Sequence, residues 1–156
     1  ALARAGIALY GVSPGPAPAD LELEPVMSFG CRIAETREVP AGTPISYGRT
    51  CVTTRPTRLA LLPVAYGNGY PRSVSGKGAC ALVHGKRAPF LGRVTMNAIV
   101  ADITDIPEAK AGDNALLFGR DGDAFLPVDE VAQLAGMIPY EVLCNVGRCA
   151  PRFFEE

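Results

Sequence analysis

The sequence predicts a mainly β domain with one short helix. Fourteen prolines and 17 glycines are spread along its 156 residues, so they divide the chain into short segments. Many of these segments are rich in Val, Ile and Thr, which favour strands. Their apolar residues alternate or form short runs, and one stretch has the pattern of a helix.

The first residues are expected to differ from the rest. Residues 1–11 have the character of a short apolar junction between a strand and a helix. The stretch 12–18 that follows contains three prolines, which lack an amide hydrogen and restrict the residue before them, so it cannot form regular structure. We therefore expect residues 1–20 to be the end of another domain and residues 21–156 to form the β domain.

Extended segments follow in order along this domain. We expect residues 23–38 to be extended, and the apolar run 58–64 to be a strand buried on both faces. Residues 81–89 resemble a hairpin that turns at Gly85, and two further strands are expected at 98–103 and 113–118.

One helix is expected from Val128 to Leu134. Asp129 and Glu130 lie in its first turn, where the helix dipole favours anions, and Gly136 ends it. Residues 138–143 then lead into an expected last strand.

Tyr47 stands at the head of the β-branched run that ends at Thr54, which predicts a strand whose beginning displays the phenol. A phenol with a pKa near 10 is a poor base at neutral pH. Lowering that pKa to near 7 requires about 4 kcal/mol from a neighbouring cation or hydrogen-bond donor. Taken alone, such a tyrosine is more often a half-buried strand residue than a catalyst.

The composition excludes several classes of protein. The apolar content of 48% suffices for a packed core, and a net charge of −1 gives no basic face for nucleic acid. The apolar runs are too short to cross a bilayer, and no signal-peptide pattern is present, so no membrane partner is expected.

The cysteines indicate a reducing compartment. Five cysteines, an odd number with no Cys-x-x-Cys pair, are typical of reduced thiols in a cytoplasmic protein. We interpret them as small buried hydrophobic residues. Because the chain has a single histidine, His84, the pair Cys144 and Cys149 makes a poor zinc site, and no metal is expected.

Six short motifs stand out along the chain, namely Arg4–Gly11, Ile45–Gly48, Tyr66–Arg72, Lys86–Pro89, Gly92–Asn97 and Tyr140–Glu141. Together they resemble the C-terminal half of the alanine racemase family, in its order and at about its spacing. The resemblance implies an alanine racemase C-terminal-type β-barrel domain, preceded by the last strand and turn of a (β/α)₈ barrel. It also implies pyridoxal phosphate as cofactor, alanine as substrate and a homodimer in which the β domain of one subunit completes the other's site.

The resemblance also implies a role for each matching residue. Tyr47 is the acid/base on one face of the substrate's α-carbon, and a lysine of the barrel serves the other face, because one base cannot reach both. The cofactor ring is the electron sink. Arg4 bonds the pyridine nitrogen of the cofactor, and Met96 holds the substrate carboxylate through its backbone amide. The phosphate contacts are Gly6, Ile7 and Tyr140, and the corridor to the site is lined by Tyr66, Arg72, Arg93 and Ile138.

None of the three lysines, Lys77, Lys86 and Lys110, lies in anything like the family's lysine motif. We therefore expect that this chain alone neither attaches the cofactor covalently nor racemises alanine, and that it needs an N-terminal barrel domain. The alternatives are the same domain in a serine or lysine racemase, a pyridoxal-phosphate decarboxylase of basic amino acids, and a stand-alone β module for binding or dimerisation. The decarboxylases place a cysteine in the role of Tyr47, which argues against them.

Overall fold

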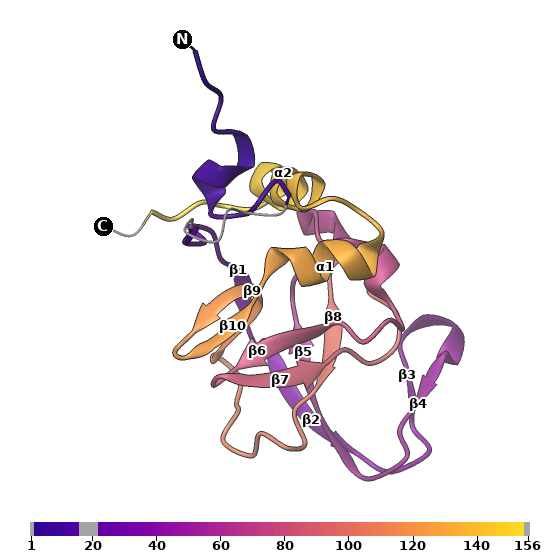
Figure 1. Ribbon diagram of the computed structural model, residues 1–156. Coiled ribbons are helices and arrows are strands. Elements are labelled where there is room, and N and C mark those ends of the chain that lie inside the picture. Colours follow the sequence, from indigo (N-terminus) through magenta and orange to yellow (C-terminus); the bar gives the residue numbers. More distant parts are fainter. Residues whose placement is uncertain (1, 16–21, 155–156) are drawn as a thin grey trace.

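The largest sheet of the domain is built around one long strand, β9. The computed structural model describes residues 2–15 and 22–154, and Figure 1 shows their arrangement. The sheet is antiparallel, with the order β1-β9-β6-β7, and β10 also pairs with β9. Ala115, Leu117, Phe118 and Gly119 of β9 are buried, so the middle of this strand is covered on both faces. The strands are β1 (Phe29–Arg32), β6 (Cys80–Val83), β7 (Lys86–Pro89), β9 (Asn114–Asp121) and β10 (Ala124–Leu126).

Two smaller sheets complete the strands. One has the order β2-β5-β8, and the other is the two-stranded hairpin β3-β4. The bridge between Phe90 and Ala101 joins the end of β7 to β8. The elements are β2 (Glu35–Val39), β3 (Pro44–Ile45), β4 (Cys51–Val52), β5 (Thr57–Leu62) and β8 (Ile99–Asp102).

The two α-helices lie together at one end of the sheets (Figure 1). Helix α1 ends at Gly136, which has a φ of 71°. This is the left-handed conformation that commonly ends a helix and that glycine adopts without strain. There are two α-helices and four short 3₁₀ helices among the described residues, namely α1 (Val128–Ala135), α2 (Pro139–Cys149), η1 (Gly6–Tyr10), η2 (Tyr47–Arg49), η3 (Tyr66–Asn68) and η4 (Arg72–Val74).

One hydrophobic core joins both larger sheets to both helices. Phe29 of β1 stacks on Phe118 of β9 and on Tyr70, with ring centroids 5.7 and 6.4 Å apart. The Tyr70 side chain is 1% exposed, and burial raises the pKa of its phenol, which keeps it neutral. Tyr70 is therefore a core residue, unlike the exposed tyrosines described below.

The mainly β class is confirmed, and several expected elements lie where they were predicted. The hairpin β6–β7 turns at His84–Gly85, and α1 covers the predicted helix. The prediction of a single helix was wrong, because residues 139–149 form α2 instead of leading into a strand. Pro139 suits the first turn of a helix, and the Glu141 carboxylate accepts a hydrogen bond from the Ile138 N–H at 3.2 Å.

The cysteines also differ from the prediction. All five are free, but only Cys80 is buried, and Cys144 and Cys149 are exposed on α2. The helix turns Val142, Leu143 and Val146 toward the core, which leaves the cysteines on its outer face. The interpretation of all five as buried hydrophobic residues was therefore wrong.

The predicted boundary at residues 20 and 21 lies outside the described residues. The segment before it nevertheless packs on the domain, because Ile7 and Val12 belong to the core. Gly11 allows the chain to pass close to Glu24. A side chain at this position would clash, because its Cβ would lie 1.9 Å from the Glu24 carbonyl oxygen.

Two kinds of feature are not found in the described part of the chain. No helix among residues 2–15 and 22–154 is long and apolar enough to cross a bilayer. Within the same ranges, no group of three or more His, Cys, Asp or Glu side chains could hold a metal ion.

A bidentate ion pair between Arg87 and Glu130 ties β7 to α1, with N···O distances of 2.5 and 2.8 Å. The Arg87 guanidinium lowers the pKa of Glu130, so the pair stabilises the fold above the ordinary glutamate pKa and loses this effect as the pH falls through the lowered value. We expect Glu130→Gln to cost about 1 kcal/mol at pH 7 and progressively less below about pH 4. Urea unfolding measured against pH checks this.

The matched control is Glu35→Gln, which breaks an exposed pair with Arg37 at 2.9 Å. Such a surface pair contributes little, so this variant is expected to follow the parent at every pH. A cost of Glu130→Gln that stays constant from pH 7 to pH 3 would contradict the prediction.

Candidate functional site

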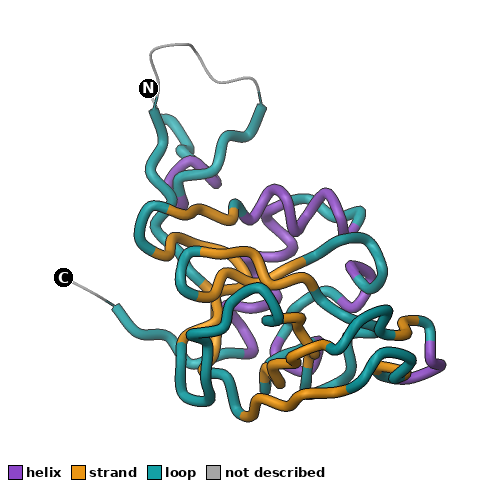
Figure 2. The backbone as a smooth tube through the Cα atoms, turned by 90° about the horizontal axis from the view of Figure 1, so that it is seen from below, coloured by secondary structure: helices purple, strands orange, loops and turns teal. Residues whose placement is uncertain are grey.

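Tyr47 lies at the tip of the β3–β4 hairpin, which projects from one side of the molecule (Figure 1 and Figure 2). The phenol is 73% exposed, and it belongs to η2 rather than to a strand. The expectation of a strand that begins at Tyr47 was therefore wrong. The hairpin is anchored below the tip by Ile45, which is buried, and by Thr53, whose hydroxyl accepts from the Thr43 N–H at 2.9 Å.

The segment Leu91–Val94 lies against this hairpin. Gly92, with φ 73°, allows the approach, because a Cβ there would lie 2.7 Å from the Ile45 carbonyl oxygen. The Ser46 hydroxyl donates to the Arg93 carbonyl oxygen at 2.7 Å. Arg93 also reaches the far side of the tip, since its Cζ is 3.6 Å from where a Cβ on Gly48 would lie. A guanidinium thus lies beside Gly48, the residue that follows Tyr47.

Met96 lies at the tip of the next turn. Thr95 closes this turn, because its N–H and hydroxyl both donate to the Ala98 carbonyl oxygen, at 3.1 and 2.8 Å. The Met96 side chain is exposed, and its carbonyl oxygen accepts from the Gly67 N–H at 2.8 Å. Among the described residues, no acceptor is found for the Met96 N–H, which leaves this amide available to a ligand.

The hydrogen bond from the Gly67 N–H to the Met96 carbonyl oxygen also connects this turn to the loop that contains η3 and η4. Tyr66 is exposed next to Gly67, and the Asn68 side chain fixes the loop by accepting from the Ala65 N–H at 3.2 Å. This loop in turn packs on α2, because the backbone at Gly69 lies directly against Asn145. Tyr66, Arg72, Met137 and Asn145 line one shallow pocket of about 410 Å³.

Ile138 and Tyr140 begin α2 next to Met137, and both side chains are exposed. A chain of contacts therefore runs from the hairpin through the loops to this helix. It joins Tyr47, Arg93, Met96, Tyr66, Arg72, Ile138 and Tyr140 on the elements η2, η3, η4 and α2 and on the Gly92–Asn97 loop.

The remaining predicted residues lie on the N-terminal segment. Arg4 and Gly6 are exposed, whereas the side chain of Ile7 is buried in the core. Gly6 begins η1 with φ 59°, and nothing lies within 4 Å of the place that a Cβ would take. The first N–H groups of a helix lack intrahelical acceptors, so this open corner can receive an acceptor from a ligand.

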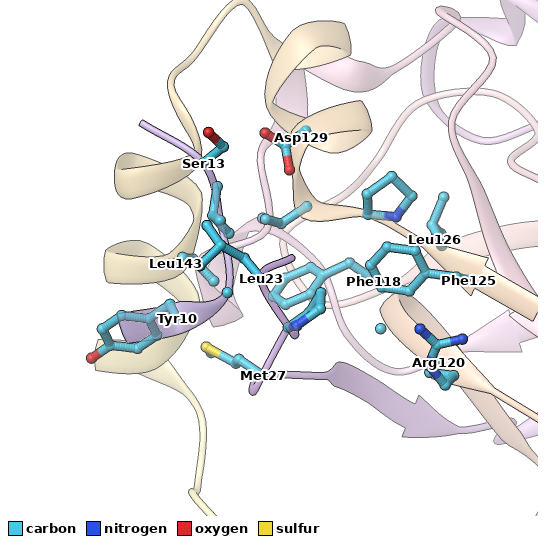
Figure 3. Close-up of a pocket in the computed structure, with 16 residues that line it drawn as sticks. Tyr10, Ser13, Leu23, Met27, Phe118, Arg120, Phe125, Leu126, Asp129 and Leu143 are labelled. Atoms are coloured by element: carbon cyan, nitrogen blue, oxygen red, sulfur yellow. The ribbon is translucent and has the colours of Figure 1, made fainter. Parts of the chain in front are cut away.

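A different pocket, of about 380 Å³, lies where residues 10–13 and 23–27 meet β9, β10 and α1 (Figure 3). Its walls combine polar and apolar groups, and the Arg120 guanidinium lies over the Phe125 ring at 5.1 Å from the centroid. None of the predicted site residues lines it. The predicted site residues therefore lie outside this pocket.

The sequence analysis missed two residues that shape the predicted site. Ser46 and Gly92 hold the hairpin and the Arg93 segment together, although neither is itself a group for chemistry. A glycine directly before the arginine, at the start of a segment without strand alternation, is the signal that indicates a close backbone approach.

The contact between the η3 loop and α2 predicts a large effect on stability. A Cβ on Gly69 would lie 2.4 Å from the Asn145 carbonyl oxygen, at a φ of 88°. We expect Gly69→Ala to lower the free energy of unfolding by about 1–3 kcal/mol more than Gly76→Ala. Gly76 is a matched control, because its φ is 74° and nothing lies within 4 Å. Urea unfolding checks this, and equal losses in the two variants would contradict it.

Comparison with known proteins gives one consistent family. A family profile described as "Alanine racemase, C-terminal domain" matches residues 26–154. An alanine racemase of Syntrophobacter fumaroxidans is 48% identical over 150 residues, which cover 94% of this chain and 39% of that protein. An alanine racemase of Halothermothrix orenii is 41% identical and covers 99% of this chain and 41% of that protein.

Solved structures agree with the sequence relatives. The alanine racemase from Bacillus anthracis with bound L-Ala-P has a TM-score of 0.87 at 34% identity, covering 97% of this chain and 39% of that one. The alanine racemase from Bartonella henselae with covalently bound pyridoxal phosphate has a TM-score of 0.86 at 30% identity, covering 96% and 40%. The chain thus spans about two fifths of the length of these relatives.

Proposed function

This chain belongs to the alanine racemase family and corresponds to its C-terminal domain, and from this premise we propose that it supplies one half of a racemase site for alanine. In this proposal Tyr47 is the acid/base on one face of the α-carbon, and a lysine of an N-terminal barrel domain is the base on the other. The single observation that carries the proposal is the exposed phenol of Tyr47 at the tip of a projecting hairpin.

The exposure of the neighbouring side chains supports a site that another polypeptide completes. Tyr47, Tyr66, Met96, Ile138 and Tyr140 are all large and exposed, although the domain has a well-formed core. Large exposed groups on elements that contact one another are typical of ligand and partner sites. In this proposal the second wall of the site comes from another polypeptide.

The proton chemistry follows from the position of Tyr47. Racemisation removes a proton from one side of a carbon and returns a proton to the opposite side, so two groups are needed. The Tyr47 oxygen holds or accepts one of these protons. The guanidinium of Arg93, which lies beside Gly48, places a permanent positive charge next to the residue that follows Tyr47.

The other residues of the proposed site bind and orient the substrate. The free N–H of Met96 can donate to the substrate carboxylate, which fixes the α-carbon relative to the hairpin. We assign Tyr66, Arg72, Arg93 and Ile138 to the corridor that leads to this position, and two of them, Tyr66 and Arg72, line the shallow pocket next to α2.

The chain's residues also fit pyridoxal phosphate, which would supply an electron sink for the α-carbanion. The open corner at Gly6 and the N–H of Ile7 suit a phosphate oxygen, and the exposed hydroxyl of Tyr140 is a further donor. Arg4 would hold the pyridine nitrogen of the cofactor. As a permanent cation it keeps that nitrogen unprotonated and so limits side reactions.

We further propose that the complete protein is a homodimer in which Tyr47 serves the partner's site. The five free thiols are consistent with a cytoplasmic protein. Action in trans is supported by the place of Tyr47 on a hairpin that projects from one side of the molecule (Figure 1 and Figure 2).

Hybrid dimers test this proposal. Full-length subunits that carry Tyr47→Phe are mixed with subunits that lack the cofactor lysine of the N-terminal domain, after reversible dissociation. Each parent dimer is expected to be inactive, whereas a hybrid has one intact composite site, so random pairing restores about a quarter of the activity. A mixture that stays inactive, although mass spectrometry shows hybrids, would overturn action in trans.

A further inference from the structure

Ser46, the residue before Tyr47, has an unusual backbone conformation. Its φ is 61° and its ψ is −175°, a region that is essentially confined to glycine. Among the described residues, only Ser46, Arg49 and His84 have a positive φ without being glycine. Ser46 directly precedes Tyr47, and Arg49 follows it by two residues. Gly48, which lies between Tyr47 and Arg49, also has a positive φ, of 75°. The chain thus adopts unfavourable backbone conformations on both sides of the phenol.

One hydrogen bond holds Ser46 in this conformation. Its hydroxyl donates to the Arg93 carbonyl oxygen at 2.7 Å, a link between residues that are 47 positions apart. Ile45 on the other side is buried, so the strand end cannot move to relieve the strain. Such conformations persist only where the surroundings over-determine them, and they gather at functional sites.

Gly92 and Arg93 complete the clamp. A Cβ on Gly92 would lie 2.8 Å from the Ser46 Cβ, so the two segments touch at this point. The Arg93 guanidinium lies over Gly48 on the opposite side of Tyr47. Arg93 therefore binds the backbone turn before the phenol through its carbonyl oxygen and lies beside the residue after the phenol with its side chain.

We propose that Ser46 is a positioning residue for Tyr47, because its bond to the Arg93 carbonyl holds the backbone turn that aims the phenol toward the partner subunit's substrate. The inference rests on the proposed function of Tyr47. Ser46 itself transfers no proton and touches no substrate. Its contribution is the direction of the Tyr47 side chain, and a small displacement of a reacting group costs a large part of the rate.

The test uses the full-length enzyme with Ser46→Ala, which removes the hydroxyl and keeps the Cβ. We expect kcat to fall about tenfold to a hundredfold with KM for alanine within about twofold of the parent. The α-deuterium isotope effect on kcat is expected to rise in the direction in which Tyr47 removes the proton, because that transfer becomes slower. A purely structural role would lower the amount of active enzyme and leave the isotope effect unchanged.

A second variant, Ser46→Gly, covers the case in which Ser46→Ala does not fold. Glycine adopts this backbone conformation without strain but cannot make the bond to Arg93, so kcat is expected to fall as in Ser46→Ala. The matched control is Thr57→Val, which removes a buried hydroxyl that donates to the Arg55 carbonyl oxygen at 2.8 Å, in β5. This control is expected to lose stability and to keep the parental kcat and isotope effect.

A readout without activity separates this inference from the proposed function. Fluorotyrosine is incorporated at the five tyrosines, and the ¹⁹F resonance of Tyr47 is assigned from its loss in Tyr47→Phe. We expect this resonance to shift or broaden in Ser46→Gly and to stay unchanged in Thr57→Val. An unchanged resonance together with a kcat within twofold of the parent would overturn the positioning role. If Tyr47→Phe itself kept the parental kcat, the proposed function would fail instead.

Discussion

Replacing Tyr47 with phenylalanine is expected to lower kcat for racemisation by about 10²- to 10⁴-fold in both directions, the range that a positioned acid/base contributes. The substitution removes one exposed hydroxyl and no core contact, because the side chain is 73% exposed. KM for alanine and the free energy of unfolding are therefore expected to stay close to their parental values. Steady-state kinetics with each enantiomer, in the full-length enzyme, measure the effect.

The two-base arrangement predicts a more specific signature of this variant. The base on the other face is still present, so it continues to remove and return the proton of one enantiomer. In D₂O, Tyr47→Phe is therefore expected to exchange the α-hydrogen of one enantiomer much faster than it forms the opposite enantiomer. The parent enzyme couples exchange and inversion more closely, because both bases act on the same carbon.

Tyr10→Phe is the matched control for this variant. Tyr10 is also a large exposed tyrosine, but it lies in η1 beside the pocket of Figure 3 and outside the proposed site. It is expected to keep the parental kcat. A Tyr47→Phe enzyme within threefold of the parent, with inversion as fast as exchange, would contradict the acid/base role.

The sequence predicted best where local chemistry decides the structure. The hairpin that turns at Gly85 follows from turn chemistry, and α1 follows from its acidic first turn and from Gly136. Helix α2 was missed because Ile138 and Val142 favour strands when they are taken one by one. The spacing of Val142, Leu143 and Val146 already gives a helix one buried face, which is the signal that outweighs these propensities.

The site shows a different limit of sequence analysis. The motifs identified Tyr47, Met96 and Arg93 as candidates, but the arrangement that brings them together is long-range. The bond from Ser46 to Arg93 spans 47 positions, and the strained φ at Ser46 depends on it. A residue with ordinary propensities gives no sign that its backbone will adopt a conformation typical of glycine. For this reason Tyr47 was expected in a strand, although it lies at a clamped hairpin tip.

The second large effect expected concerns the chain by itself. Without an N-terminal barrel domain, residues 1–156 are expected to show no racemisation above a solution of pyridoxal phosphate, a loss of the full catalytic rate. The reason lies in the lysines. A lysine that attaches the cofactor must lose its proton and stay free to attack a carbonyl group. Lys77 instead donates to the Leu134 carbonyl oxygen at 2.9 Å, and Lys86 pairs with Glu108 at 2.9 Å.

Lys110 is the remaining candidate, and its place argues against it. It lies in the loop between β8 and β9, at the end of the molecule opposite α2 and Tyr140 (Figure 1). Borohydride treatment of the chain with pyridoxal phosphate, followed by mass spectrometry, is therefore expected to find no stoichiometric modification at any one lysine. Adding a separately prepared barrel domain is expected to restore racemisation, and the same addition to Tyr47→Phe is not. One cofactor bound per chain at a single lysine, with turnover in the absence of the barrel, would show that this domain is an enzyme by itself.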